Sequence, residues 1–269
     1  MRPSRMLAFT AGLAPAIIGM AIIGTGAPAA AASAVSYVAL GDSYSSGVGA
    51  GGATGSCSRS PHAYPALWAA ANPAASFTFA ACAGARTGDV IKNQLSSLSS
   101  STTLVSITIG GNDVGFSSIM QTCVLHSTSA CESAVAAAEK YANNTLPGLL
   151  GTTLAGIRSH APNAKIIVLG YPEFYDLGAW LCLGLSGADH QALDNGIDDL
   201  NGVIKKAAAA NGDTFAGVRT AFSGHELCDW HAWLHSVTLP VGNSYHPTAA
   251  GQQDGYLPVF SAAASKAGQ

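Results

Sequence analysis

Short apolar stretches alternate along the chain with longer segments of helical periodicity. Five β-rich runs predict strands at Val35–Leu40, Ser76–Ala80, Thr103–Ile109, Lys165–Leu169 and Thr214–Val218. Helices are expected over residues 61–72, 88–98, 132–160, 189–211 and 247–266. Strands that alternate with helices indicate βαβ units, with helices on both faces of a parallel sheet. The pattern therefore predicts one α/β domain with a mainly parallel sheet of about five strands.

The N-terminal segment has a different pattern. Two arginines precede an apolar run that extends to about Ile23, and Ala32-Ser33-Ala34 offers a small-residue cleavage site. These are the three parts of a secretory signal peptide. The alternative is a retained membrane anchor, which needs roughly 20 predominantly apolar residues, but glycines and a proline interrupt this run. We expect residues 1–34 to be a signal peptide, residues 35–269 to form the domain, and the protein to be secreted.

The net charge of the chain bears on which class of partner is expected. The chain has 12 Lys and Arg against 15 Asp and Glu, a net charge of −3, and loss of the leader's two arginines would make it more acidic. Nucleic-acid binding depends on clustered cations. Nucleic acid is therefore not the expected partner.

Six cysteines follow the leader, and their even number in an exported chain suggests disulfides. Six thiols allow 15 pairings, among which the sequence does not choose. The residues are Cys57, Cys82, Cys123, Cys131, Cys182 and Cys228.

Residues with catalytic chemistry follow two of the expected strands. The first strand runs directly into Gly41-Asp42-Ser43, and the third into Gly110-Gly111-Asn112-Asp113. Ser244-Tyr245-His246-Pro247 precedes the C-terminal helix. Functional groups of parallel sheets gather beyond the carboxyl ends of the strands. A serine nucleophile needs a neighbouring base, and a developing oxyanion needs fixed hydrogen-bond donors. We therefore expect Ser43, Asn112 and His246 to converge.

These segments resemble the four sequence blocks of the SGNH (GDSL-type) hydrolase family, in order and along essentially the whole mature chain. The blocks are Gly41-Asp42-Ser43-Tyr44-Ser45, Ala81-Cys82-Ala83-Gly84-Ala85, Gly110-Gly111-Asn112-Asp113 and His246-Pro247. The resemblance implies a flavodoxin-like three-layer α/β/α sandwich. It also implies that Ser43 is the nucleophile and His246 the base. The implied oxyanion hole consists of the N–H groups of Ser43 and Gly84 and the side-chain amide of Asn112.

One position departs from the family pattern. The family usually has an acid three residues before the histidine, where this chain has Asn243. A secreted branch of the family instead orients the histidine through a backbone carbonyl two residues upstream, here that of Ser244. Such a carbonyl can accept from Nδ1–H and so fix the tautomer. The hypothesis is a Ser43–His246 dyad assisted by Ser244, and a carboxylate on His246 Nδ1 would contradict it.

The branch that the chain resembles contains exported lipases and phospholipase A-type enzymes with three disulfides. The resemblance implies the bridges Cys57–Cys82, Cys123–Cys131 and Cys182–Cys228. It implies an extracellular, monomeric serine hydrolase of lipid esters that needs no metal or cofactor and touches lipid surfaces transiently. The alternatives are a carbohydrate acetylesterase of the same fold and a non-catalytic secreted binding protein on a hydrolase scaffold.

Other residues permit more than one interpretation. The run from His225 to His235 contains three histidines and Cys228, a set that could bind zinc, although a disulfide at Cys228 would remove its thiolate. The three residues Trp180, Trp230 and Trp233 could line an acyl groove or pack in the core. We expect Asp42 and Asp113 to be structural caps. The carboxylates of Asp194, Asp198 and Asp199 are expected on the solvent face of a helix.

Overall fold

The computed structural model describes residue 8, residues 35–73 and residues 75–266. The expected signal peptide therefore lies, apart from one residue, outside the described part of the chain. None of the helices that are described is long and apolar enough to cross a membrane.

Within the described residues, five parallel strands form one sheet in the order β2-β1-β3-β4-β5. The strands are β1 (Ser36–Gly41), β2 (Ser76–Phe79), β3 (Leu104–Thr108), β4 (Lys165–Leu169) and β5 (Thr214–Ala216). All five expected strands are present, with ends shifted by at most two residues. Every residue of β3 is buried, as in a parallel sheet that is covered on both faces.

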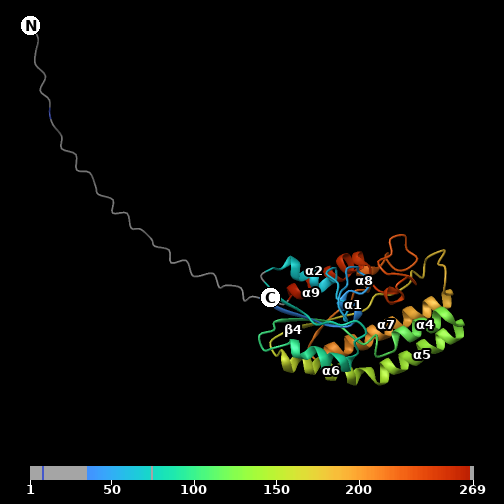
Figure 1. Ribbon diagram of the computed structural model, residues 1–269, viewed down its shortest axis with the longest axis horizontal. Helices are drawn as coiled ribbons and strands as arrows, with labels where there is room; N and C mark the ends of the chain where they lie inside the picture. The colour runs from blue at the N-terminus through green and yellow to red at the C-terminus, as the bar shows by residue number, and fades with distance from the viewer. Residues whose placement is uncertain (1–7, 9–34, 74, 267–269) are drawn as a thin grey trace, which may run out of the picture. The chain divides into compact units, whose positions relative to one another are not determined.

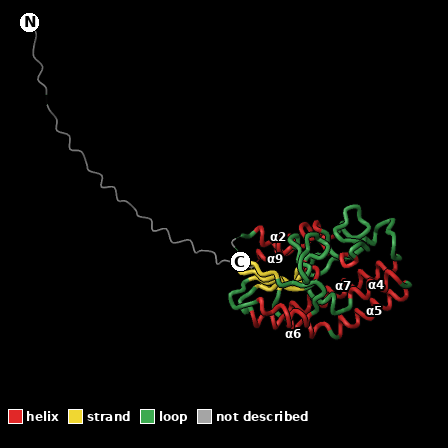
Figure 2. Tube along the Cα trace, in the orientation of Figure 1, coloured by secondary structure: helices red, strands yellow, loops and turns green. Residues whose placement is uncertain are grey.

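Helices cover both faces of the sheet (Figures 1 and 2). One face carries α2 (Tyr64–Ala71), α8 (Arg219–Phe222), the π-helical η4 (Gly251–Tyr256) and α9 (Leu257–Ser265). The other carries α4 (Phe116–Leu125), α5 (Thr128–Asn144), α6 (Leu146–His160) and α7 (Gly187–Ala210). Short turns complete the chain: α1 (Ser43–Ser46), α3 (Thr87–Asp89), η1 (Val90–Gln94), η2 (Leu95–Ser97) and η3 (Val241–Asn243). The predicted three-layer α/β/α sandwich is confirmed.

Several helical segments differ from the prediction. The helix expected over 88–98 consists of three short pieces, α3, the π-helical η1 and the 3-10 turn η2. The single helix expected over 132–160 is two helices, α5 and α6, which meet at Thr145. Pro147 lies in the first turn of α6, where the missing N–H of proline costs no hydrogen bond. Helix α4 was not predicted, although Phe116, Ile119, Met120 and Cys123 have the spacing of one helical face.

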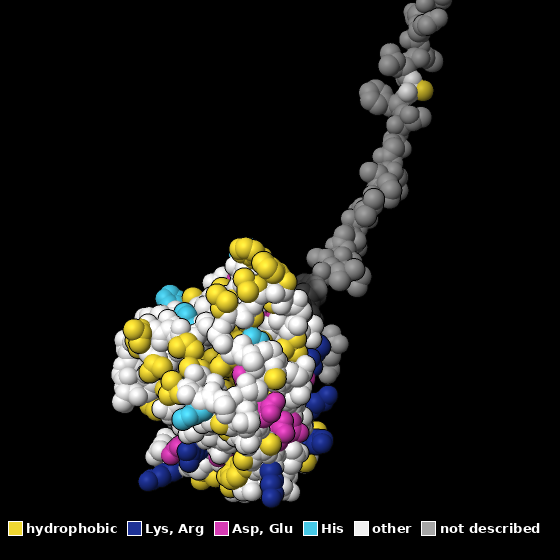
Figure 3. Space-filling view, turned by 90° about the vertical axis from the view of Figure 1, so that its right-hand side faces the viewer, with side chains coloured by type: hydrophobic (Ala, Val, Ile, Leu, Met, Phe, Trp, Pro, Cys, Tyr) yellow, Lys and Arg dark blue, Asp and Glu magenta, His cyan; other side chains and the backbone are white. Residues whose placement is uncertain are grey.

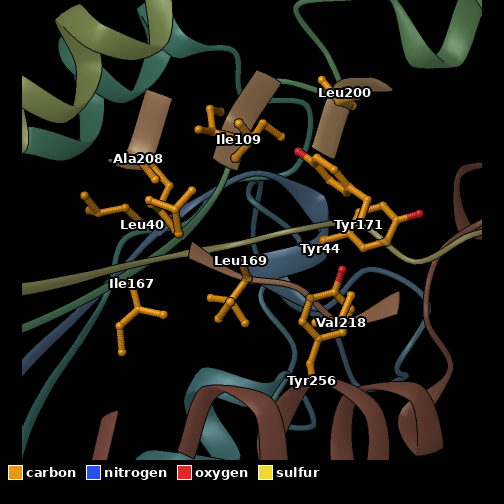
Figure 4. Close-up of a cluster of buried hydrophobic side chains, with 14 of the residues drawn as sticks. Leu40, Tyr44, Ile109, Ile167, Leu169, Tyr171, Leu200, Ala208, Val218 and Tyr256 are labelled. Carbon is orange, nitrogen blue, oxygen red and sulfur yellow. The ribbon is translucent and has the colours of Figure 1, made fainter. Parts of the chain in front are cut away.

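The interior joins the strands to both helical layers. Figure 4 shows Leu40, Ile167 and Leu169 of the sheet among aliphatic neighbours, with a group of tyrosines to one side. All three leucine and isoleucine side chains are completely buried. Burial of one such side chain stabilises the fold by roughly 1.5–3 kcal/mol.

Asp194 does not lie on the solvent face of α7, as expected, but is buried with 1% of its surface exposed. Its Oδ1 accepts from the backbone N–H groups of Phe174 (2.8 Å) and Tyr175 (3.3 Å). Buried backbone donors need acceptors, and a carboxylate on the facing helix supplies one. Burial raises the pKa of Asp194 to about 7. The prediction was wrong because the loop after β4 packs against this turn of α7.

Replacement of this carboxylate tests its structural role. Asp194→Ala removes the acceptor for two buried N–H groups and is expected to lower the free energy of unfolding by about 1–3 kcal/mol. The raised pKa means that the folded state holds the proton more tightly, so the loss should be larger at pH 4 than at pH 7. Urea unfolding measures both values. The exposed Asn195→Ala on the same helix is the control, and an equal effect of both substitutions would contradict the assignment.

Candidate active site

The turn after β1 fixes the position of Ser43. Gly41 has a φ of +117°, and a Cβ atom there would lie 2.4 Å from the Thr108 carbonyl oxygen of the neighbouring strand. Only glycine fits this close approach without strain. The chain then enters α1, whose first residue is Ser43. The nucleophilic hydroxyl expected from the sequence therefore lies at the carboxyl edge of the sheet.

Asp42 connects this turn to two other strands. Its carboxylate caps α1 by accepting from the Tyr44 N–H at 3.0 Å. It also accepts from the Thr108 hydroxyl of β3 at 2.7 Å and from the hydroxyl of Tyr171, which follows β4. Burial raises the pKa of Asp42 to about 6, although these hydrogen bonds oppose the shift. The expectation of a structural cap is confirmed.

Ser43 and His246 are in direct contact. His246 Nε2 lies 2.7 Å from Ser43 Oγ, and its Nδ1 lies 3.0 Å from the carbonyl oxygen of Ser244. Because a carbonyl can only accept, Nδ1 carries the proton and Nε2 accepts from the serine hydroxyl. Among the described residues, no carboxylate is hydrogen-bonded to this imidazole. Asn243 contributes only its backbone carbonyl, which accepts from the His246 N–H.

His246 is held in its neutral form. Burial lowers its pKa to about 4, and the nearby His235 adds a smaller effect in the same direction. The Ser244 carbonyl partly opposes this shift because it favours a proton on Nδ1. An imidazole with this pKa is a free base at neutral pH and can accept a proton from a hydroxyl.

Three candidate oxyanion donors lie on three segments, which follow β1, β2 and β3. The Asn112 side-chain amide donates to the Ala85 carbonyl at 3.1 Å, which ties the loop after β3 to the residue next to Gly84. Within the described chain, the backbone N–H groups of Ser43 and Gly84 have no hydrogen-bond partner. An unpaired N–H is available to an oxyanion that develops within its reach.

Asp113 belongs to the same junction but has a structural role. Its carboxylate accepts from the Thr87 hydroxyl at 2.6 Å and from the Thr87 N–H at the start of α3. The expected role as a cap is confirmed.

Side-chain contacts of Tyr44 and Gln94, which the sequence did not indicate, hold the segments of the site together. The Tyr44 hydroxyl donates to the Tyr245 carbonyl at 2.6 Å, and Tyr245 has a left-handed φ of +62°. Gln94 donates to the carbonyl and accepts from the N–H of Gly41, at 2.9 and 2.8 Å. No local pattern reveals these contacts, since Tyr44 and Tyr245 are 201 residues apart.

The cysteines pair as the family resemblance implies, in the bridges Cys57–Cys82, Cys123–Cys131 and Cys182–Cys228. The first bridge precedes Gly84 by two residues, and the Ala83 N–H also bonds to the Cys57 carbonyl at 3.1 Å. The loop that carries Gly84 is thus fixed from two sides.

The residues of the histidine-rich segment have separate partners. His225 stacks on Trp233 with ring centroids 3.6 Å apart, while His235 Nε2 contacts the Gly49 carbonyl at 2.9 Å. Cys228 is bridged to Cys182. The His235 N–H also donates to the His246 carbonyl at 3.0 Å, which joins the end of this segment to the residue that carries the imidazole.

The tryptophans are divided between the interior and the surface. Trp233 packs against Phe222 of the core. Trp180 and Trp230 are 89% and 94% exposed, so neither of the two expected positions, groove or core, holds for them.

An apolar cavity extends from Ser43 between α4, α5 and α7. It has about 670 Å³ of free space, including the part open to solvent. Its lining includes Ser43 and Asn112, and also Glu139 of α5. Most of the remaining wall is apolar and comprises Val114, Phe116, Ile119, Met120, Val135, Ala138, Ala142, Phe174, Leu193, Ile197 and Leu200.

Similarity to known proteins agrees with this geometry. Residues 39–253 match the GDSL-like lipase/acylhydrolase family. The chain is 54% identical to Lipase 1 of Streptomyces coelicolor over 98% of its own length and the whole of that protein.

Two solved structures are similar in fold and sequence. An extracellular lipase from Streptomyces rimosus has 55% identity and a TM-score of 0.84, with 86% of this chain and 100% of that chain covered. A phospholipase A1 from Streptomyces albidoflavus has 52% identity and a TM-score of 0.83, with 85% and 99% covered.

The protonation state of His246 can be measured directly. Because burial lowers its pKa to about 4, the imidazole should stay neutral and protonated on Nδ1 at pH 6. We expect a titration followed by ¹⁵N NMR of the ring to have its midpoint near pH 4. His246→Gln identifies the resonance, and a midpoint near the ordinary value of about 6.5 would contradict the burial of this ring.

Proposed function

Because the chain belongs to the GDSL-like lipase/acylhydrolase family, we propose that it is an extracellular, monomeric hydrolase of lipid carboxylic esters. The hydrogen bond from Ser43 to His246 supports hydrolysis. The relatives named lipase and phospholipase A1 support a lipid substrate. The disulfides and the extracellular relative support export, with residues 1–34 removed, which N-terminal sequencing of protein from the culture medium tests.

The proposed reaction passes through an acyl-enzyme. His246 Nε2 takes the Ser43 proton as Oγ attacks the ester carbonyl carbon. The imidazolium returns this proton to the departing alcohol oxygen when the carbon–oxygen bond breaks. Water then attacks the acyl-serine, loses a proton to His246, and releases the carboxylic acid as the proton returns to Ser43.

The surroundings of Ser43 support both charged intermediates. The free N–H groups of Ser43 and Gly84, with the Asn112 amide, are the proposed donors to each oxyanion. Such donors are each worth about 2.7–4 kcal/mol in comparable sites. The Ser244 carbonyl dipole stabilises the imidazolium, because its oxygen accepts from Nδ1–H. This arrangement uses a dyad and a backbone dipole in place of a carboxylate.

The apolar cavity is the observation that favours a long acyl chain over an acetyl group. It begins at Ser43 and has mainly aliphatic and aromatic walls on α4, α5 and α7. Each methylene that enters such a site gains about 0.8 kcal/mol from removal of apolar surface from water. An acetyl group has no methylene to place against these apolar walls, so the cavity does not favour the carbohydrate acetylesterase.

Replacement of the nucleophile is the direct test. Ser43→Ala should reduce p-nitrophenyl butyrate hydrolysis by about 10⁴-fold or more, because Ser43 has the only hydroxyl among the described residues that is hydrogen-bonded to His246. A fluorophosphonate should label the wild-type protein at Ser43 and leave the variant unlabelled. The exposed Ser101→Ala is the matched control. Retained turnover or labelling in the folded Ser43→Ala variant would refute the proposal, and absence of both from the wild type would favour a binding protein.

The cavity makes a separate prediction about chain length. Ala142 lies on the cavity wall formed by α5, and Ala142→Leu would fill part of the space. We expect kcat/KM for p-nitrophenyl palmitate to fall by about tenfold or more while the value for the butyrate ester stays nearly constant. Ala136→Leu, on the exposed side of the same helix, is the control. An equal loss on both esters, or a preference of the wild type for sugar acetates, would contradict an acyl-binding cavity.

A further inference from the structure

Exposed apolar side chains border the active site at the carboxyl edge of the sheet. We call this group the apolar rim: Trp180, Leu183, Trp230, Leu239 and Val241, which are between 71% and 94% exposed. Figure 3 shows hydrophobic side chains gathered over the upper and left parts of this end of the molecule. Single exposed apolar residues are common, but a group of this size marks an interaction surface.

The segments that carry the rim are joined to one another and to the site. The Cys182–Cys228 bridge links the loop of Trp180 to the segment of Trp230. The segment of Leu239 ends at Ser244, whose hydroxyl oxygen accepts from the Thr238 N–H at 3.0 Å. Figure 1 shows these loops together, in gold and orange-red, beyond the ends of the strands. The rim is therefore a tethered structure beside His246.

The rim also lacks ionic groups. Residues 177–186 and 230–245 contain no Asp, Glu, Lys or Arg. On the face in Figure 3, Lys and Arg lie at the lower and right margins, away from most of the hydrophobic groups. A charge in the rim would have to lose its hydration on contact with lipid, at high cost. Attraction to anionic lipid, by contrast, relies on clustered Lys and Arg. The composition matches an uncharged or zwitterionic lipid surface.

We propose that the apolar rim docks the protein on a neutral lipid–water interface and so presents the cavity at Ser43 to that surface. Tryptophan suits this position because its ring is apolar and its N–H remains able to bond to water or headgroups. An acyl chain could then pass from the lipid into the apolar cavity with little exposure to water. This inference rests on the proposed function, since it concerns how a lipid ester reaches the same site.

Binding to vesicles tests the rim apart from catalysis. In a Ser43→Ala background, which spares the lipid, partitioning into phosphatidylcholine vesicles is measured by flotation. The joint replacement of Trp180, Trp230 and Leu239 by Gln should reduce partitioning on the order of 100-fold. When the same three substitutions are made in protein that retains Ser43, the rate of hydrolysis of soluble p-nitrophenyl butyrate should stay within about twofold of the wild-type rate. Surface substitutions outside the site have small effects. Hydrolysis of emulsified long-chain ester should fall in parallel with binding.

A matched pair of single variants controls for loss of hydrophobic surface in general. Leu239→Gln should weaken partitioning by about threefold or more. Leu125→Gln, at a 64% exposed leucine of α4 outside the rim, should leave it unchanged. The inference would be overturned if the wild type and the triple variant bound vesicles equally well. It would also be overturned if binding required anionic lipid, or if the rim caused self-association of the protein without lipid. A wild type that binds vesicles but hydrolyses no ester would instead refute only the proposed function.

Discussion

The buried carboxylate of Asp42 is the interaction on which the geometry of the site depends. It joins the end of β1 to β3 through Thr108 and to the chain after β4 through Tyr171. The same group caps the short helix that begins at Ser43. A buried carboxylate is stable only when its oxygens are well bonded. Three donors from three segments therefore define where β1 ends and where the nucleophile begins.

The histidine side of the site is fixed through the residue next to the nucleophile. Tyr44 donates to the carbonyl of Tyr245, which precedes His246. The ring centroids of Tyr44 and His246 are also 5.1 Å apart. Burial in this environment keeps His246 neutral, and a carbonyl dipole takes the place that an acid has in most of the family. His246 is thus positioned by the Ser244 carbonyl and by Tyr44, while Asp42 positions Ser43.

Charged residues are scarce both in the cavity wall and in the loops on the surface around it. The cavity wall is mainly apolar, and the loops around it carry no Asp, Glu, Lys or Arg over two long stretches. Only 10% of the whole chain is charged. Lipid esters are substrates whose long apolar part has to leave water or another lipid before reaction. The apolar walls and uncharged loops suit the transfer of such a chain, whereas the buried carboxylates of Asp42 and Asp194 accept hydrogen bonds that hold the fold together.

The sequence by itself determined the order of the strands along the chain, the layered α/β fold, the placement of Ser43 and Asn112 at strand ends, and the placement of His246 before the C-terminal helix. These features follow from local periodicity and from short motifs, and family resemblance added the cysteine pairing. The sequence also showed that Asn243 stands three residues before His246, where the family usually has an acid. Only the tertiary structure decided that Asp194 is buried, that Trp180 and Trp230 face solvent, and that Tyr44 reaches Tyr245. These outcomes depend on contacts between residues far apart in the chain, and local periodicity carries no information about which distant segment will pack against a given side chain.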